Sequence, residues 1–269
     1  MRGILAFFFF IRLVHSYGQQ FQRVDSLFLF RTVSLNAQSV YTDGKNQIYI
    51  LSKENDIILI NPLGEIVNKY SNNYLGKPQF VYFQNPLQLL LFYPDFQTLI
   101  ILDRSLNELN RTELNAYNIP RVNTIGYTPD KAIWYYEESS GRVKKINKAG
   151  MTEVEVRIPS IHRGQDMEEI RAQDNEILFF DRSGEVTILD AFGKAKFTRK
   201  LVGNLVDWDG PRFYAFDPFT QKICLSAEDR IESFKLPSNP VALTAIALIS
   251  DGLVGVNESG EVMVFHFNE

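Results

Sequence analysis

Short apolar runs, each followed by a polar turn, recur along this chain. Six of them stand out in the sequence: NQIYILSKEN, LQLLLFYPDF, KAIWYYEESSG, NEILFFDRSG, RFYAFDPFTQ and DGLVGVNESG. The first polar or turn-side residues after these runs are 36 to 44 residues apart: Ser52, Tyr93, Glu137, Asp181, Asp217 and Asn257. A repeat of this length indicates an architecture built from copies of one supersecondary unit.

Each run is also preceded by a turn-forming pair and followed by a second extended segment. The pairs are Asp43-Gly44, Asn85-Pro86, Pro129-Asp130, Asp174-Asn175, Asp209-Gly210 and Asp251-Gly252. In several copies a further turn, such as Leu63-Gly64 or Phe192-Gly193, leads into a more polar strand. Each unit of about 40 residues therefore predicts four short antiparallel strands, the size of one propeller blade. We find no stretch of a dozen residues with sustained helical periodicity.

The last unit contains only three strands: ALTAIALIS, GLVGVNES and EVMVFHFN. The segment DSLFLFRTVSL, residues 25–35, precedes the first unit and can supply the missing fourth strand. The alternative is a loose N-terminal arm, which would leave LFLF exposed. The predicted fold is all-β: a six-bladed propeller of four-stranded antiparallel blades, closed by strand 25–35. The predicted blades cover approximately residues 37–71, 78–115, 122–159, 167–202, 205–237 and 241–268.

The first residues, MRGILAFFFFIRLVHSYGQQ, have the pattern of a secretory signal. Arg2 precedes an apolar run from Ile4 to Ile11, and Ser16 and Gly18 have cleavage spacing. We therefore expect a signal peptide over residues 1–18 and a single propeller domain over residues 19–269. The alternative is a buried N-terminal strand, and Arg12 interrupts the apolar region. The run is too short to span a bilayer, and we expect no membrane span after cleavage.

Charge and cysteine content exclude some classes of protein. Without residues 1–18 the chain has 26 basic and 32 acidic residues, a net charge of −6. Nucleic-acid binders normally carry a basic patch, so we expect no nucleic-acid partner. Cys224 is the only cysteine and cannot form an intramolecular disulfide. Its place in the strand pattern QKICLS predicts a buried, inert thiol.

With DRSGEV and NESGEV between apolar runs, followed in one copy by DAFGK, the chain resembles six-bladed propellers of the NHL, TolB-like and YncE-like kind. The resemblance covers nearly all of the mature chain, and its motifs reflect turn chemistry. Trp-Asp occurs once, at Trp208-Asp209, without Gly-His pairs, so a WD40 assignment is poorly supported. The resemblance implies a rigid platform in complexes of the cell envelope.

Candidate catalytic chemistry is sparse. A lactonase-like metal site would need oxygen ligands from several blades at the channel mouth. Five aspartates have a suitable side chain, but their turn positions already explain them: Asp43, Asp130, Asp174, Asp209 and Asp251. His162 and His266 lie in separate contexts and cannot form a histidine-rich site. We expect no catalytic residue, no cofactor and no metal.

Aromatic side chains near loop tips are the best candidates for partner contacts. They lie in FYPDFQ, WYYEESSGR and VDWDGPRFY, and the long connection RIPSIHRGQDMEE adds two polar candidates. The candidate partner-binding residues are Tyr93, Phe96, Tyr136, His162, Arg163 and Trp208. The alternative for the aromatic residues is that their rings pack between blades. The hypothesis is an exported, non-catalytic propeller that binds an envelope protein, in the periplasm or outer envelope or else secreted. The alternative is small-molecule binding or a metal-dependent hydrolase at the channel mouth.

Overall fold

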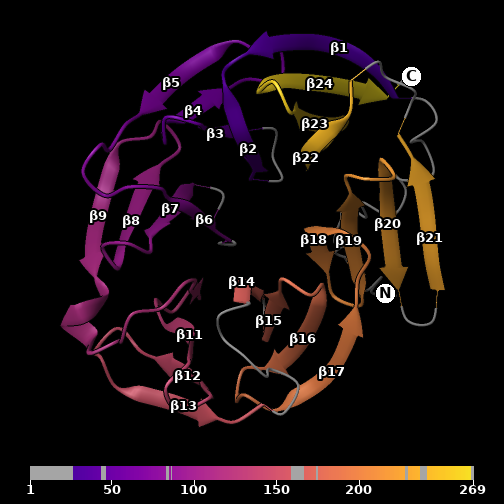
Figure 1. Ribbon diagram of the computed structural model, residues 1–269. Helices are drawn as coiled ribbons and strands as arrows, with labels where there is room; N and C mark the ends of the chain where they lie inside the picture. Colours follow the sequence, from indigo (N-terminus) through magenta and orange to yellow (C-terminus); the bar gives the residue numbers. More distant parts are fainter. Residues whose placement is uncertain are drawn as a thin grey trace, which may run out of the picture.

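The computed structural model describes residues 27–43, 47–82, 85, 87–158, 167–173, 175–227, 230–236 and 241–267. These residues form six four-stranded sheets arranged around a central axis (Figure 1). Within each sheet the strands pair antiparallel with their neighbours. The predicted six-bladed propeller of antiparallel blades is confirmed.

The strands of the first three blades follow one another along the chain. The first blade contains β2 (Ala37–Thr42), β3 (Ile48–Ser52), β4 (Ile57–Ile60) and β5 (Ile66–Tyr70). The second contains β6 (Gln79–Val81), β7 (Gln88–Tyr93), β8 (Thr98–Asp103) and β9 (Glu108–Glu113), followed by the short 3-10 helix η2 (Leu114–Tyr117). The third contains β10 (Gly126–Tyr127), β11 (Ile133–Glu137), β12 (Arg142–Ile146) and β13 (Thr152–Val156).

The last three blades include one that takes its outer strand from the other end of the chain. The fourth contains β14 (Met167–Gln173), β15 (Glu176–Asp181), β16 (Glu185–Asp190) and β17 (Ala195–Lys200). The fifth contains β18 (Asn204–Asp209), β19 (Arg212–Asp217), β20 (Lys222–Ala227) and β21 (Arg230–Lys235). The sixth contains β22 (Leu243–Ile249), β23 (Gly252–Asn257), β24 (Glu261–Phe267) and β1 (Leu27–Ser34).

β1 closes the ring. It pairs antiparallel with β24 from Leu27 opposite Phe267 to Ser34 opposite Glu261, with a register shift between Leu29 and Arg31. In Figure 1 the indigo β1 lies along the outer side of the yellow β24. The closing strand expected within residues 25–35 is thus present and occupies the outer edge of the sixth blade.

The hydrophobic core consists of six clusters, each between two neighbouring blades. For example, Ile48 and Ile50 of the first blade pack with Val254 and Val256 of the sixth. The middle strands are buried on both faces, as in β3 and β23, whose residues are all buried. Strands covered on both faces read as continuous apolar runs, which explains the repeated runs in the sequence.

The turns at residues 181–185 and 257–261 show why the sequences DRSGEV and NESGEV are alike. Asp181 Oδ1 accepts the backbone N–H of Glu185 at 2.9 Å, and Gly184 has a φ of 85°. Asn257 Oδ1 accepts the backbone N–H of Glu261 at the same distance, and Gly260 has a φ of 82°. Positive φ favours glycine, and a short polar side chain caps the turn. The recurring letters therefore encode turns between the second and third strands.

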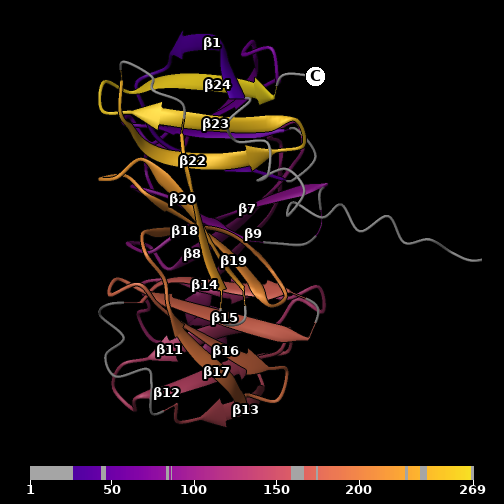
Figure 2. The same ribbon diagram turned by 90° about the vertical axis from the view of Figure 1, so that its right-hand side faces the viewer.

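The alternating strand directions give the ring two distinct faces, seen at either end of the strands in the side view of Figure 2. We call one the connection face. It carries the turns between second and third strands and the connections between blades, such as residues 94–97, 218–221 and 71–78. The opposite face carries the turns between first and second strands and between third and fourth strands, such as residues 190–194.

Candidate functional site

Three of the predicted partner-binding residues are buried, so for them the alternative holds and their rings pack between blades. Tyr93 ends β7 with 0% exposure, packed between the first and second blades. Tyr136 in β11 and Trp208 in β18 are also buried, and the Trp208 indole donates to the Gly210 carbonyl at 2.6 Å. Large rings at strand ends provide apolar area that the interfaces between blades take up. These rings have too little exposed surface to anchor a partner.

Phe96 is exposed, while His162 and Arg163 lie outside the described residues. Phe96 belongs to the turn between β7 and β8, and 55% of it is accessible to solvent. A second phenylalanine, Phe219, lies in the corresponding turn of the fifth blade with 96% exposure. The similar sequences YPDFQT and DPFTQK indicate that the two turns are alike, but Phe219 was not among the predicted contact residues.

A glutamine fixes each of these two turns. Gln97 Nε2 donates to the carbonyls of Pro94, at 2.6 Å, and Val122, at 2.8 Å. Its Oε1 accepts the Val122 N–H at 2.9 Å. The Gln97 side chain therefore ties the turn of the second blade to the segment that enters the third.

Gln221 makes the same set of hydrogen bonds in the fifth blade. Its Nε2 donates to the carbonyls of Pro218 and Leu243, and its Oε1 accepts the Leu243 N–H at 2.9 Å. Both glutamines have a positive φ, 49° for Gln97 and 55° for Gln221. Phe96 and Phe219 are therefore presented on turns held to the next blade. The second and fifth blades lie across the ring from each other (Figure 1).

The central channel forms the second candidate site. A cavity of about 830 Å³ is lined mainly by the inner strands β2, β6, β14, β18 and β22. Aromatic side chains form much of its wall: Tyr41, Phe80, Tyr82, Phe180 and Trp208. Tyr41 and Phe80 stack with their ring centroids 5.1 Å apart. Small-molecule pockets have comparable volumes and mixed linings.

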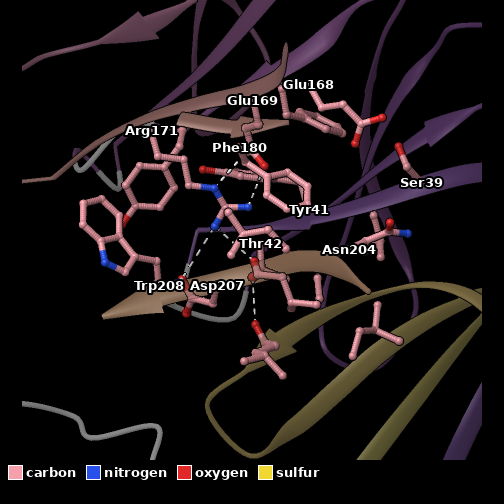
Figure 3. A pocket seen from close by; sticks show the side chains of 18 of the residues that line it. Ser39, Tyr41, Thr42, Glu168, Glu169, Arg171, Phe180, Asn204, Asp207 and Trp208 are labelled. Atoms are coloured by element: carbon pink, nitrogen blue, oxygen red, sulfur yellow. Dashed lines mark hydrogen bonds and ion pairs between the residues drawn. The ribbon is translucent and has the colours of Figure 1, made fainter. Parts of the chain in front are cut away.

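Arg171 is the central charged group of this channel (Figure 3). Its Nε and Nη2 atoms donate to the two oxygens of Glu169 at 2.7 and 3.0 Å. Its Nη1 atom donates to the Val206 carbonyl at 3.2 Å and lies 3.9 Å from Asp207 Oδ1. The guanidinium also lies 5.6 Å from the centre of the Tyr82 ring. Arg171 thus connects the fourth blade to the fifth and to the second.

The two carboxylates beside Arg171 have different environments. Glu169 forms a bidentate pair with the guanidinium, which is the stronger geometry. Asp207 accepts the Trp208 N–H at 2.8 Å, and its side chain is 21% exposed, towards the channel. Burial raises the pKa of the Asp207 carboxyl, and the nearby Arg171 opposes this only in part. Burial likewise raises the pKa of the Tyr41 hydroxyl.

The turn aspartates have local partners. Asp43 accepts the Gln47 N–H, Asp130 pairs with Lys145 at 3.2 Å, and Asp251 lies 2.8 Å from His266. Asp209 pairs with Arg212, and Asp174 lies outside the described residues. Within the described residues no group of three or more His, Cys, Asp or Glu could hold a metal.

The thiol of Cys224 is buried, as predicted, and burial raises its pKa.

Across the part of the chain that the structure describes, no helix has the length and apolar character to cross a membrane.

Comparison with known proteins identifies the fold of this chain. No family model and no curated protein matches it. A catalytically inactive virginiamycin B lyase from Staphylococcus aureus, solved with quinupristin, is 14% identical with a TM-score of 0.60, covering 90% of this chain and 100% of that one. The Swd1 β-propeller domain of Myceliophthora thermophila is 10% identical with a TM-score of 0.61, over 90% and 100% of the two chains.

The WD40 propeller domain of Doa1 is 10% identical with a TM-score of 0.56, over 90% of this chain and 98% of that one. These three proteins have different names and share an architecture, so the likeness identifies the fold alone. The resemblance to six-bladed propellers noted from the sequence is confirmed at that level, and the chain is a six-bladed β-propeller.

Proposed function

We propose that this protein is a non-catalytic propeller that holds another protein against its connection face. The observation that carries the proposal is the pair of exposed phenylalanines, Phe96 and Phe219, on corresponding turns. Aromatic side chains dominate the energy of protein interfaces when they enter a pocket of the partner. Turns fixed before binding lose less conformational entropy on association.

Other apolar side chains on this face extend the proposed contact surface. Tyr74 and Val202 are exposed in connections between blades. Gly76, two residues after Tyr74, lies against Asp95, the neighbour of Phe96. The surface around Phe96 therefore includes the connection from the first blade. A partner that contacts both phenylalanines would cover the mouth of the channel.

The proposed location is the cell envelope, reached by export. It rests on the signal-like pattern of residues 1–18, which lie outside the described residues. His162 and Arg163 stay in the proposed contact set on sequence grounds alone. Tyr93, Tyr136 and Trp208 are removed from it because they are buried.

The test is affinity capture after cross-linking, using envelopes of the source organism, with the parent protein and single Phe→Ala variants. We expect Phe96→Ala and Phe219→Ala each to reduce recovery of one stoichiometric partner, with affinity falling about 30-fold for a loss of about 2 kcal/mol. Phe192→Ala is the matched control, because Phe192 is 84% exposed on the opposite face. Equal recovery by all variants, or equal loss with Phe192→Ala, would contradict the proposal.

A further inference from the structure

Among the residues that the structure describes, the lining of the central channel contains more negative than positive charge. Five of these lining residues are carboxylates, and three of them have a cation of their own. Asp43 lies 3.7 Å from Arg104, and Glu168 lies 3.3 Å from Arg182. Asp209 pairs with Arg212. The remaining two, Glu169 and Asp207, share Arg171, so among the described residues one negative charge is left without a counter-charge.

The unbalanced charge lies closest to Asp207. Glu169 uses both oxygens on Arg171, whereas Asp207 has one cationic neighbour, Arg171 at 3.9 Å, and one backbone donor. From the described residues no hydrogen bond reaches Asp207 Oδ2. An isolated carboxylate in a poorly solvated site is costly unless a cation or a proton neutralises it. Its part-exposed side chain borders the cavity, so a ligand in the cavity can supply the cation.

The rest of the wall also suits a cation. Electron-rich ring faces attract ammonium and guanidinium groups, and Arg171 already uses the ring of Tyr82 in this way. Tyr41, which like Tyr82 is only partly buried, borders the same cavity. Asp207 and these aromatic side chains therefore offer the two components of an organic-cation site, a carboxylate and π faces.

We propose that the channel binds an organic cation whose ammonium or guanidinium group lies beside Asp207, between the aromatic side chains and the Arg171–Glu169 pair. The ligand balances the charge that the protein leaves uncompensated. The groups that interact electrostatically with Asp207 are Arg171, Asp209, Glu169 and the hydroxyls of Tyr41 and Tyr214. A cavity of about 830 Å³ has room for the organic part of such a ligand. This site is separate from Phe96 and Phe219, so it does not depend on the proposed function.

Calorimetric titration of the full protein tests this proposal with matched ligands. N-acetyl-arginine amide represents a basic peptide side chain, n-butylammonium represents a free amine, and N-acetyl-citrulline amide is a neutral analogue of similar shape. We expect one-to-one binding of at least one cation and at least tenfold weaker binding of the citrulline compound. Binding of arginine amide alone would indicate a peptide source, and binding of butylammonium would indicate that a free amine suffices.

Variants distinguish the channel from general electrostatic attraction. Asp207→Asn keeps the shape of the side chain and should weaken cation binding at least tenfold. Asp95→Asn removes the same charge from an exposed turn outside the cavity lining, and should leave affinity unchanged. If Asp207→Asn does not fold, Glu169→Gln provides the second variant and should also weaken binding.

Several results would overturn the proposal. One is equal affinity for the arginine and citrulline compounds, and another is an equal effect of Asp207→Asn and Asp95→Asn. The absence of binding by either cation at millimolar concentration would mean that a proton alone neutralises Asp207.

Discussion

The middle strands of each blade are more buried than its outer strand. β15 and β16 each bury four consecutive apolar or small side chains, while the outer strand β17 is almost entirely exposed. The inner strands β14 and β18 carry the charged residues Arg171 and Asp207 into the channel. The middle strands therefore maintain the ring, and the flanking strands and turns are free to carry chemistry.

β1 is a flanking strand, yet it helps to hold the ring together. Its removal should therefore have the largest effect on stability. A chain that begins at residue 36 leaves β24 without its outer neighbour and opens the ring. We expect loss of cooperative thermal unfolding, monitored by circular dichroism, and loss of monodisperse protein. A chain that begins at residue 25 keeps β1 and is the control. If both chains melt cooperatively within a few degrees of each other, closure by β1 is unimportant for stability.

Two phenylalanines in mutual contact compare a middle and an outer strand directly. Phe213 of β19 is fully buried, while Phe197 of β17 is partly exposed, and their ring centroids are 5.9 Å apart. Phe213→Ala should lower the free energy of unfolding by about 3–5 kcal/mol, because it leaves a cavity. Phe197→Ala should cost about 1 kcal/mol, the contribution of the ring contact and a half-buried side chain. Urea unfolding measures both values, and similar losses would remove the distinction between the strands.

The glutamine turns should have an intermediate effect on stability. Gln97→Ala leaves the Val122 N–H and the carbonyls of Pro94 and Val122 without their partner. We expect a loss of about 1–3 kcal/mol in urea unfolding, the cost of unsatisfied buried groups. Gln97→Gly loses the same hydrogen bonds but relieves the positive φ, so it should be the less destabilised of the two. The reverse order would show that backbone strain at residue 97 is negligible.

The smallest expected effect on stability is at Asp207, and its size depends on pH. Burial raises the pKa of Asp207 above its unfolded value, so the native state binds the proton more tightly. This contribution to stability is present below the unfolded pKa of about 4 and is lost as the pH rises through the folded pKa. Asp207→Asn cannot ionise and should be slightly more stable than the parent at pH 7, with the difference vanishing near pH 3.

Urea unfolding at pH 7 and near pH 3 measures this difference. Asp95→Asn, at an exposed carboxylate, should show little change at either pH. If Asp207→Asn is destabilised at pH 7, the Asp207 charge stabilises Arg171 by more than its burial costs.

The contrast between middle strands and flanking strands also explains what could be predicted from the sequence. Ile48 and Ile50 lie between two blades, so their run had to be apolar, and the turn at Gly184 required its glycine. The six blades and the closing strand follow from such local patterns. Tyr93 could not be placed, because a ring at the end of a strand has the same sequence neighbours whether it faces a core or solvent.

Arg171 and Asp207 could not be brought together from the sequence either. They lie on inner strands of different blades, and their approach depends on how the fourth and fifth blades sit around the axis. No local spacing reports that geometry. Phe219 was within reach, because YPDFQT and DPFTQK share a proline, a phenylalanine and a glutamine within the turn.

The pairing of Leu27 with Phe267 also determines the order in which the chain can fold. The strands of the other five blades are consecutive in the chain, whereas β1 and β24 must meet across nearly the whole chain, which makes their pairing entropically expensive and slow. During synthesis β1 leaves the ribosome before the other described strands and has no partner until β24 follows. Until then its backbone edge and its LFLF segment are open to other chains, and Phe28, Leu29 and Phe30 remain exposed even in the closed ring. A chaperone that covers this segment would speed productive folding without changing the final stability.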